Sequence, residues 1–204
     1  MRVCGIALLG ALLLHGSVSP AAAAQGAPQV TDRMRTGAME SSYVKQPGTS
    51  VKWGRATALV NASADDIEAI IHDYARYKTF LPNFEASKVL SKRGSSALLY
   101  VQVSVMHGAS KIWAELKARP EKNTGATRVV NIKMLKGNVK HFGARWEITP
   151  VGAKQSVVTF QLIVDPDLPV PSGIVSAENQ KSARKTIRAL RKLMVSKGLA
   201  TPIK

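Results

Sequence analysis

IEAIIHDYARYKTFLPNFEASK, residues 67–88, is the stretch of sequence that decides the fold. Ser63 precedes it as a candidate helix N-cap, with Asp66 three residues later. Apolar side chains then recur at helical spacing, at Ile67, Ile70, Ile71 and Tyr74. Pro82 ends any helical continuation. The pattern therefore predicts a helix that runs into a tight aromatic corner and then into a strand.

Five later segments alternate apolar and polar residues, as half-buried antiparallel strands do. The predicted inward sets are Leu99, Val101, Val103 and Val105; Ile112, Ala114, Leu116 and Ala118; Val130, Ile132 and Met134; Phe142, Ala144, Trp146 and Ile148; and Val158, Phe160, Leu162 and Val164. Thr159 and Gln161 are expected to face outward. Because the inward sets hold no acid, base or histidine, a catalytic acid or base would have to lie in a loop or on a helix.

Small inward residues leave room inside this sheet. Ala114 and Ala144 alternate with much larger side chains on the same predicted face. The alternation is compatible with a cavity and equally with a filled core, because protein interiors are normally close-packed.

A basic amphipathic helix is predicted from about Ser172 to Lys197. Its apolar face holds Ala183, Ile187, Leu190 and Met194, with Thr186 and Leu193 beside them. Its basic face, expected to point away from the apolar side, holds Lys181, Arg184, Lys185, Arg188 and Lys192. Such a face either is an ordinary solvated surface or contacts anionic lipid, as interfacial helices do.

The first residues resemble a secretory signal peptide. A basic start precedes an apolar run from Val3 to Leu14 that is too short to span a bilayer, and an alanine-rich cleavage site follows. Cleavage near Ala24 would remove Cys4, the single cysteine, and with it any disulfide or thiolate site. The predicted organisation is a signal peptide (1–24), a polar linker (25–50) and one domain (51–204). This predicts a periplasmic or secreted protein; a retained N-terminal anchor is the alternative.

The charge balance is strongly basic. Twenty-nine Lys and Arg against 13 Asp and Glu give a formal net charge of +16. Such a charge suggests nucleic acid or an anionic surface as partner. Since export argues against nucleic acid, an anionic membrane surface is the expected partner, and a basic surface kept for solubility is the alternative. The oligomeric state is left open.

No recognised catalytic or metal-binding motif occurs in the chain. His72, His107 and His141 have no metal-site spacing, and the P-loop, GxGxxG, GxSxG and HExxH patterns are absent. We therefore predict no metal, no cofactor and no catalytic residues. His107, in a predicted turn, and Tyr100 are the polar side chains expected nearest to an opening of the fold.

Three segments carry a resemblance to a known family. The corner DYARYKTFLPNF (73–84), the later GARWEITP (143–150) and the basic C-terminal helix together resemble the START-like (SRPBCC) superfamily. The specific branch is that of polyketide cyclases and coenzyme Q-binding START-domain proteins, and the resemblance covers roughly residues 51–197. It implies an α+β helix-grip fold, in which a curved antiparallel sheet wraps around a long C-terminal helix and holds a ligand between them.

This resemblance implies an exported protein that binds a lipid or other hydrophobic small molecule in an internal cavity; whether it also transfers that ligand is left open. The expected ligand-binding residues are Val103, Leu116, Ile132, Met134, Phe142, Trp146, Phe160, Ile187, Leu190 and Met194. The five basic residues of the helix are the expected membrane contact. Two alternatives remain: a cyclase- or aromatase-type enzyme acting on a polyketide-like substrate, which requires polar side chains converging inside, and a module with a filled core.

Overall fold

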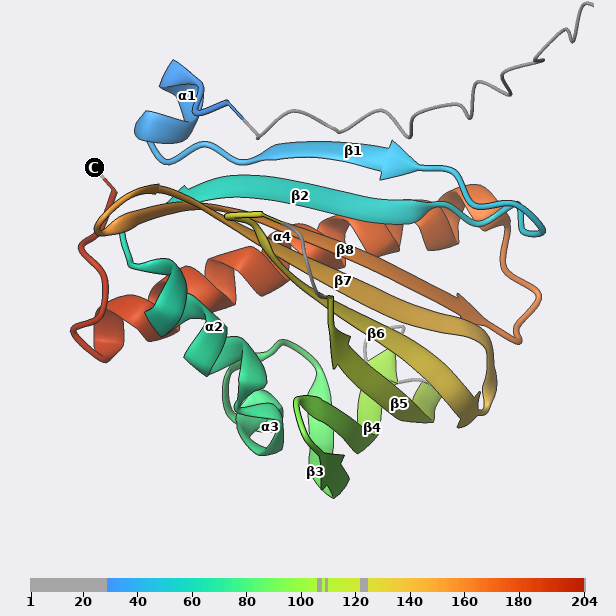
Figure 1. Cartoon of the computed structure of the whole chain (residues 1–204). Coiled ribbons are helices and arrows are strands. Elements are labelled where there is room, and N and C mark those ends of the chain that lie inside the picture. Colours follow the sequence, from blue (N-terminus) through green and yellow to red (C-terminus); the bar gives the residue numbers. More distant parts are fainter. Residues whose placement is uncertain (1–28, 106–107, 109, 122–124, 204) are drawn as a thin grey trace, which may run out of the picture.

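A single antiparallel sheet frames the molecule (Figure 1). The computed structural model describes residues 29–105, 108, 110–121 and 125–203, and in these residues eight strands pair in the order β1-β2-β8-β7-β6-β5-β4-β3. The elements are α1 (Asp32–Arg35), β1 (Glu40–Val44), β2 (Trp53–Val60), α2 (Ala64–His72), the 3₁₀ helix η1 (Tyr74–Arg76), α3 (Tyr77–Phe80), β3 (Phe84–Arg93), β4 (Ser96–Val105), β5 (Ser110–Pro120), β6 (Arg128–Gly137), β7 (Val139–Gly152), β8 (Gln155–Pro166) and α4 (Ser172–Ser196).

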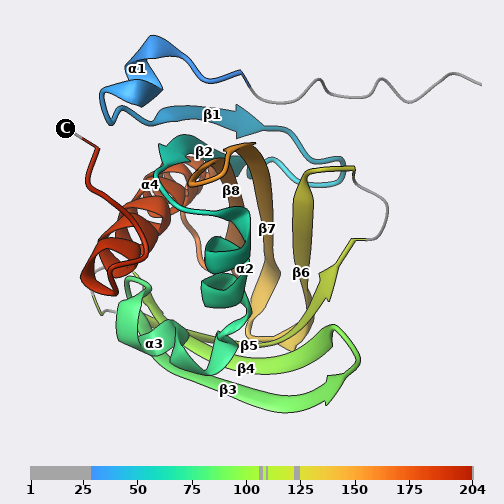
Figure 2. The same ribbon diagram turned by 60° about the vertical axis from the view of Figure 1, so that its left-hand side comes forward.

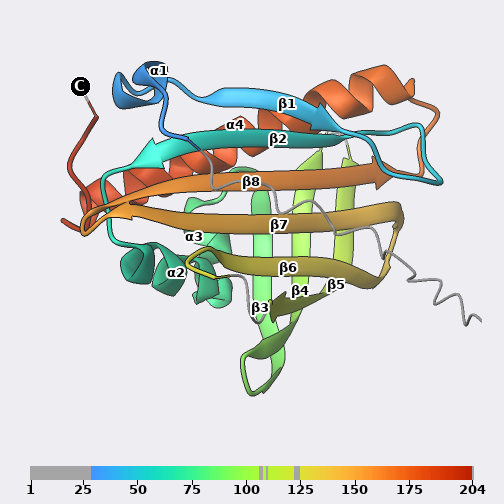
Figure 3. The same ribbon diagram turned by 45° about the horizontal axis from the view of Figure 1, so that its top comes forward.

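The sheet folds over on itself between β6 and β5. Strand β6 pairs with β7 over residues 128–133 and with β5 over residues 130–137, with a register shift at Glu115 and Leu116. A bulge of this kind bends a strand and increases its twist. Strands β3, β4 and β5 therefore cross behind β1, β2, β8, β7 and β6 (Figure 3), and in Figure 2 they pass beneath α2 and α3, with α4 on the side opposite β6.

The predicted alternation of the strands is confirmed. The inward sets form one buried cluster with the apolar face of α4. Thr159 and Gln161 lie outside this inner cluster, as their predicted outward placement requires, but both are buried and not exposed to solvent. Part of the outer face of β8 is itself covered: Met34 of α1 packs against Val157, and a second outer cluster forms around Ile163. Strand β8 is thus buried on both faces.

The predicted linker contains ordered structure in its described residues. Strand β1 pairs with β2 as an edge strand, and Met34 of α1 is 1% exposed. The segment looked like a linker because four of the five β1 side chains are exposed, which leaves its sequence polar. The predicted signal peptide and His107 lie outside the described residues. Within the described residues, none of the helices combines the length and apolarity needed to cross a bilayer.

The aromatic corner forms as predicted. The Ser63 hydroxyl caps α2 by accepting a hydrogen bond from the Asp66 backbone N–H at 3.1 Å. After η1 and α3, the chain turns at Asn83, whose φ of 66° makes it the one non-glycine residue with positive φ in the described part of the chain. The Asn83 carbonyl accepts from the Ser104 N–H at 2.8 Å, which ties the corner to β4. Asparagine tolerates this left-handed conformation better than most residues.

The backbone of helix α4 lies directly against the backbone of β2, with no side chain between them at Gly54. A Cβ added to Gly54 of β2 would lie 2.1 Å from the Gln180 backbone nitrogen, so no side chain fits between the helix and the strand. Polar side chains fasten the helix on either side of this point. Asn179 bonds to both backbone groups of Val164 at 3.1 and 3.2 Å, and the Arg191 guanidinium donates to the Leu59 carbonyl at 2.6 Å. A curved sheet closed by a C-terminal helix is the helix-grip arrangement.

Gly54 gives the sharpest test of this packing. Gly54→Ala should lower the free energy of unfolding by at least about 3 kcal/mol, or prevent folding, because the new methyl group would overlap the α4 backbone. Gly173→Ala is the matched control, since a Cβ there meets nothing within 4 Å and alanine favours helix. Urea unfolding of both variants measures the difference. Equal stabilities would show that α4 does not sit against β2 as described.

Candidate functional site

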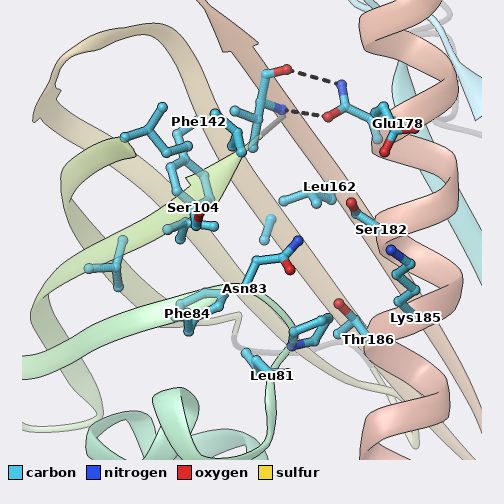
Figure 4. A pocket seen from close by; sticks show the side chains of 18 of the residues that line it. Leu81, Asn83, Phe84, Ser104, Phe142, Leu162, Glu178, Ser182, Lys185 and Thr186 are labelled. Carbon is cyan, nitrogen blue, oxygen red and sulfur yellow. Dashed lines mark hydrogen bonds between the residues drawn. The ribbon is translucent and has the colours of Figure 1, made fainter. Parts of the chain in front are cut away.

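A cavity of about 600 Å³ lies between the inner face of the sheet, the aromatic corner and α4 (Figure 4). This volume is within the range of about 300 to 1,000 Å³ that small-molecule sites occupy. Its lining comes from Tyr77, Leu81, Pro82, Asn83, Phe84, Leu99, Val101, Val103, Ser104, Val105, Gly108, Ile112, Leu116, Ile132, Phe142, Ala144, Trp146, Phe160, Leu162, Val164, Pro166, Val170, Ile174, Val175, Glu178, Asn179, Lys181, Ser182, Lys185 and Thr186.

The strands supply an almost wholly apolar wall. Trp146 of β7 and Phe160 of β8 are cross-strand neighbours with ring centroids 4.2 Å apart. Among the described strand residues of the lining, Ser104 carries a hydroxyl and Trp146 an indole N–H, and the other side chains are apolar. A ligand in this part of the cavity would meet hydrocarbon and aromatic surface, which rewards the burial of apolar groups.

The polar part of the lining comes from α4 and the corner. Figure 4 shows Ser182, Lys185 and Thr186 on the helix, with Asn83 of the corner facing them. The Asn179 amide is fully engaged with the Val164 and Lys52 backbones. The cavity therefore has an apolar side made by the sheet and a polar side made by the helix.

Six of the ten expected ligand-binding residues line the cavity. They are Val103, Leu116, Ile132, Phe142, Trp146 and Phe160. Ile187, Leu190 and Met194 lie outside the lining, because their face of α4 is turned into the closed core. Met134 also lies outside it, on β6 beside the bulge where its sulfur adjoins Gly137. Whether the six bind a ligand stays a prediction.

The expectation that all five basic residues of α4 point away from the cavity is wrong for two of them. Lys181 and Lys185 border the cavity, and Lys185 is only half exposed. Arg184, Arg188 and Lys192 are exposed and lie outside the lining. The difference arises because α4 is rotated so that one of its flanks, and not its apolar face, meets the cavity.

Sequence reasoning missed this flank. Glu178, Ser182 and Lys185 follow one another at i, i+4 and i+7, which places them on one side of the helix. The sequence shows that these three residues lie on one side of the helix. The neighbouring residues, however, do not indicate whether that side borders a cavity or faces solvent. Tyr100, expected near an opening, instead stacks on Trp113 with ring centroids 6.4 Å apart, and it is not part of the lining.

Two buried tyrosines support the corner next to the cavity. The Tyr77 hydroxyl donates to the Ile71 carbonyl at 2.6 Å, and burial raises the pKa of this phenol well above its usual value. Burial, with a smaller contribution from Glu68, raises the pKa of Tyr74 to about 12. The Tyr74 hydroxyl is buried and has no hydrogen-bond partner in the described part of the chain. Both phenols therefore stay neutral in the fold.

The histidines of the described region lie away from the cavity lining. Burial lowers the pKa of His72, whose ring packs 5.8 Å from that of Tyr74. His141 Nδ1 lies 3.5 Å from an Asp165 carboxylate oxygen. Across residues 29–105, 108, 110–121 and 125–203, no group of three or more His, Cys, Asp or Glu side chains is placed to hold a metal ion.

Comparison with known proteins gives one family match. A family model described as polyketide cyclase/dehydrase and lipid transport matches residues 60–191. None of the curated proteins matches the chain.

Several solved structures share the fold. A fragment of the STAR-related lipid transfer protein from Xanthomonas axonopodis superposes with a TM-score of 0.66 at 19% identity, covering 77% of this chain and 93% of that chain. A START superfamily protein from Mycobacterium smegmatis gives 0.62 at 19% identity, covering 71% and 97%. Human StAR-related lipid transfer protein 5 gives 0.66 at 10% identity, covering 78% and 83%. At these identities the likeness shows the fold alone.

The two tyrosines should differ in their effect on stability. At neutral pH, Tyr77→Phe should lower the free energy of unfolding by about 1 kcal/mol, because it removes a buried hydrogen bond. Tyr74→Phe should cost nothing, because its hydroxyl is buried and unpaired in the described part of the chain. Urea unfolding at pH 7 measures both. A larger loss for Tyr74→Phe than for Tyr77→Phe would contradict the geometry.

The same phenols predict a loss of stability at alkaline pH. A tyrosine in the unfolded chain ionises near pH 10, whereas Tyr74 in the fold holds its proton to about pH 12. The native state thus binds more protons in this window, and the free energy of unfolding should fall as pH rises from about 10 to 12. Tyr74→Phe should make that decline shallower. An unchanged pH profile in the variant would refute the assignment.

Proposed function

Because the chain belongs to the polyketide cyclase/dehydrase and lipid transport family, we propose that it binds a lipid or other hydrophobic small molecule in the cavity between the sheet and α4. The observation that carries the proposal is the apolar wall of that cavity, built around Trp146 and Phe160. Two of the structural neighbours are named as lipid transfer proteins, which agrees with this use of the fold.

The binding mechanism is desolvation. Each buried methylene group contributes about 0.8 kcal/mol, so an acyl, isoprenoid or ring system can be held with few hydrogen bonds. An aromatic pair such as Trp146 and Phe160 offers a large flat surface against which such a group can pack. The apolar part of the ligand would leave water and contact a wall to which it needs to make no hydrogen bonds.

An enzyme acting on a polyketide-like substrate is the alternative. It needs an acid or base at a reacting atom. The one carboxylate of the described lining, Glu178, is paired with Lys181 at 3.0 Å, and both side chains stand on the outer part of α4. The apolar strand wall favours a carrier. Incubation of the protein with its own extracted ligand separates the two, because a mass change of the ligand over hours would identify an enzyme.

Export to the periplasm or beyond is part of the proposal and rests on the sequence of residues 1–24. In that setting the basic residues of α4 outside the cavity would contact anionic headgroups. Arg184, Arg188 and Lys192 are exposed and have no ion-pair partner in the described part of the chain. Ile174, at the start of the same helix, lines the cavity and is 58% exposed. Basic and apolar side chains on one helix suit a membrane surface.

Organic extraction of the purified protein, followed by mass spectrometry, tests the binding proposal directly. A hydrophobic compound recovered at close to one equivalent supports it. An empty protein that also binds no hydrophobic probe would refute it.

Filling the cavity should block ligand uptake without loss of the fold. Ala144 lines the cavity, so Ala144→Leu should lower ligand occupancy at least tenfold and leave the free energy of unfolding within about 1 kcal/mol of the wild type. Ala114 is fully buried and outside the lining, so Ala114→Leu should overpack the core and cost about 1 to 3 kcal/mol. Native mass spectrometry and urea unfolding give the two readouts. If Ala144→Leu is as destabilising as Ala114→Leu, the space beside Ala144 is not a cavity.

The proposed membrane contact predicts charge-dependent vesicle binding. Changing Arg184, Arg188 and Lys192 together to Gln should weaken binding to anionic vesicles at least tenfold, since each basic residue near such a surface contributes about 1 kcal/mol. The matched control removes three exposed lysines from the strands, at Lys88, Lys117 and Lys133. Vesicle co-sedimentation at low and high salt measures binding. Equal loss in both triple variants would show that total charge, and not α4, is responsible.

A further inference from the structure

Within the described part of the chain, one cation on the polar side of the cavity has no counter-charge. Of the two lysines in the lining, Lys181 is neutralised by Glu178. Lys185 has no ion-pair partner in the described part of the chain, and it is only half exposed. An ammonium group that borders a cavity and has no counter-charge can gain a charge-assisted hydrogen bond from an anionic ligand.

Three other side chains with hydrogen-bonding groups border the same side of the cavity. Ser182 and Thr186 flank Lys185 on the cavity side of α4, and Asn83 reaches toward the helix from the corner (Figure 4). None of the three side chains makes a hydrogen bond within the described part of the chain. Hydroxyl and amide groups can donate to an anionic oxygen, as the ammonium does. The ammonium and these three side chains can therefore all donate hydrogen bonds to the same anionic group of a ligand.

We propose that the cavity binds an amphiphile with one anionic head group, either a carboxylate or a phosphate monoester. The head group would bind at Lys185, between Ser182, Thr186 and Asn83. The apolar tail of the ligand then lies along the strand wall toward Trp146 and Phe160. This inference rests on the proposed function, and it adds the chemical class of the ligand and its orientation.

The neighbouring ion pair helps to select this head group. Glu178 stands one turn before Ser182, and its carboxylate would repel an anion if it were free. Its 3.0 Å contact with Lys181 offsets that repulsion. A neutral head, as in an alcohol or a sterol, would leave the Lys185 charge uncompensated, whereas a cationic head would be repelled by it.

A head-group series tests the inference with chemically matched probes. The probes are dodecanoate, dodecyl phosphate and dodecanol, which share one tail, and binding is measured by calorimetry on full-length protein stripped of ligand on a hydrophobic resin. Wild-type protein should bind at least one anionic probe about tenfold more tightly than the alcohol, as expected for a charge-assisted contact at a half-exposed site. This preference should shrink with added salt.

Two lysine variants assign the preference to one residue. Lys185→Gln should lower the affinity for the anionic probe about tenfold and leave the affinity for dodecanol within twofold. Lys192→Gln makes the same chemical change on an exposed part of α4 outside the lining, and it should alter neither. Comparing the affinities for dodecanoate and dodecyl phosphate identifies which anionic head group is preferred.

The outcomes separate this inference from the proposed function. Equal binding of alcohol and anions, or an equal effect of Lys185→Gln on all probes, overturns the head-group assignment while ligand binding stands. Failure of all three probes to bind wild-type protein, together with no ligand on extraction, overturns the proposed function and the inference with it.

Discussion

The contact between α4 and Gly54 is the constraint on which the rest of the structure depends. Because the Gly54 position has no side chain, the helix and β2 meet at backbone distance, and Asn179 and Arg191 can reach backbone groups of the strands from there. This close approach sets the distance between α4 and the sheet and the rotation of α4 about its own axis. The rotation turns Ile187 and Leu190 into the closed core and leaves the flank with Ser182 and Lys185 to border the cavity. The close approach at Gly54, together with the Asn179 and Arg191 hydrogen bonds, thus determines which flank of α4 borders the cavity.

The elements that could be predicted are those whose signals are local. The Ser63 cap and Pro82 delimit the helix and the corner, and the two-residue alternation identifies the inward side chains of β4 to β8. These features need no knowledge of distant residues. The fold class was instead implied by the resemblance to the START-like superfamily, and the family match over residues 60–191 agrees with it.

The errors arose where long-range packing decides. An edge strand such as β1 has a polar sequence because both of its faces meet solvent, so composition alone cannot tell it from a linker. The helical wheel correctly separates an apolar from a basic face of α4, but it cannot say which flank borders a cavity. That depends on contacts such as Asn179 with Lys52, which are 127 residues apart. Seven of the ten expected lining residues are on strands, and six of these seven line the cavity, whereas the three on α4 lie in the core.

The order of elements along the chain has a consequence for how the protein reaches this fold. Helix α4 follows all eight described strands in the sequence, and its anchors on β2 and in the N-terminal arm, Leu59 and Gly37, lie 132 and 154 residues before Arg191. Closing loops of this length precedes any gain from the contact, which slows folding. Until α4 has been made and has docked, the part of the apolar inner face that α4 covers stays exposed, although α2 and the corner already cover another part. The nascent chain therefore passes through a stage at which it is prone to aggregate, and protection by other factors would matter most then.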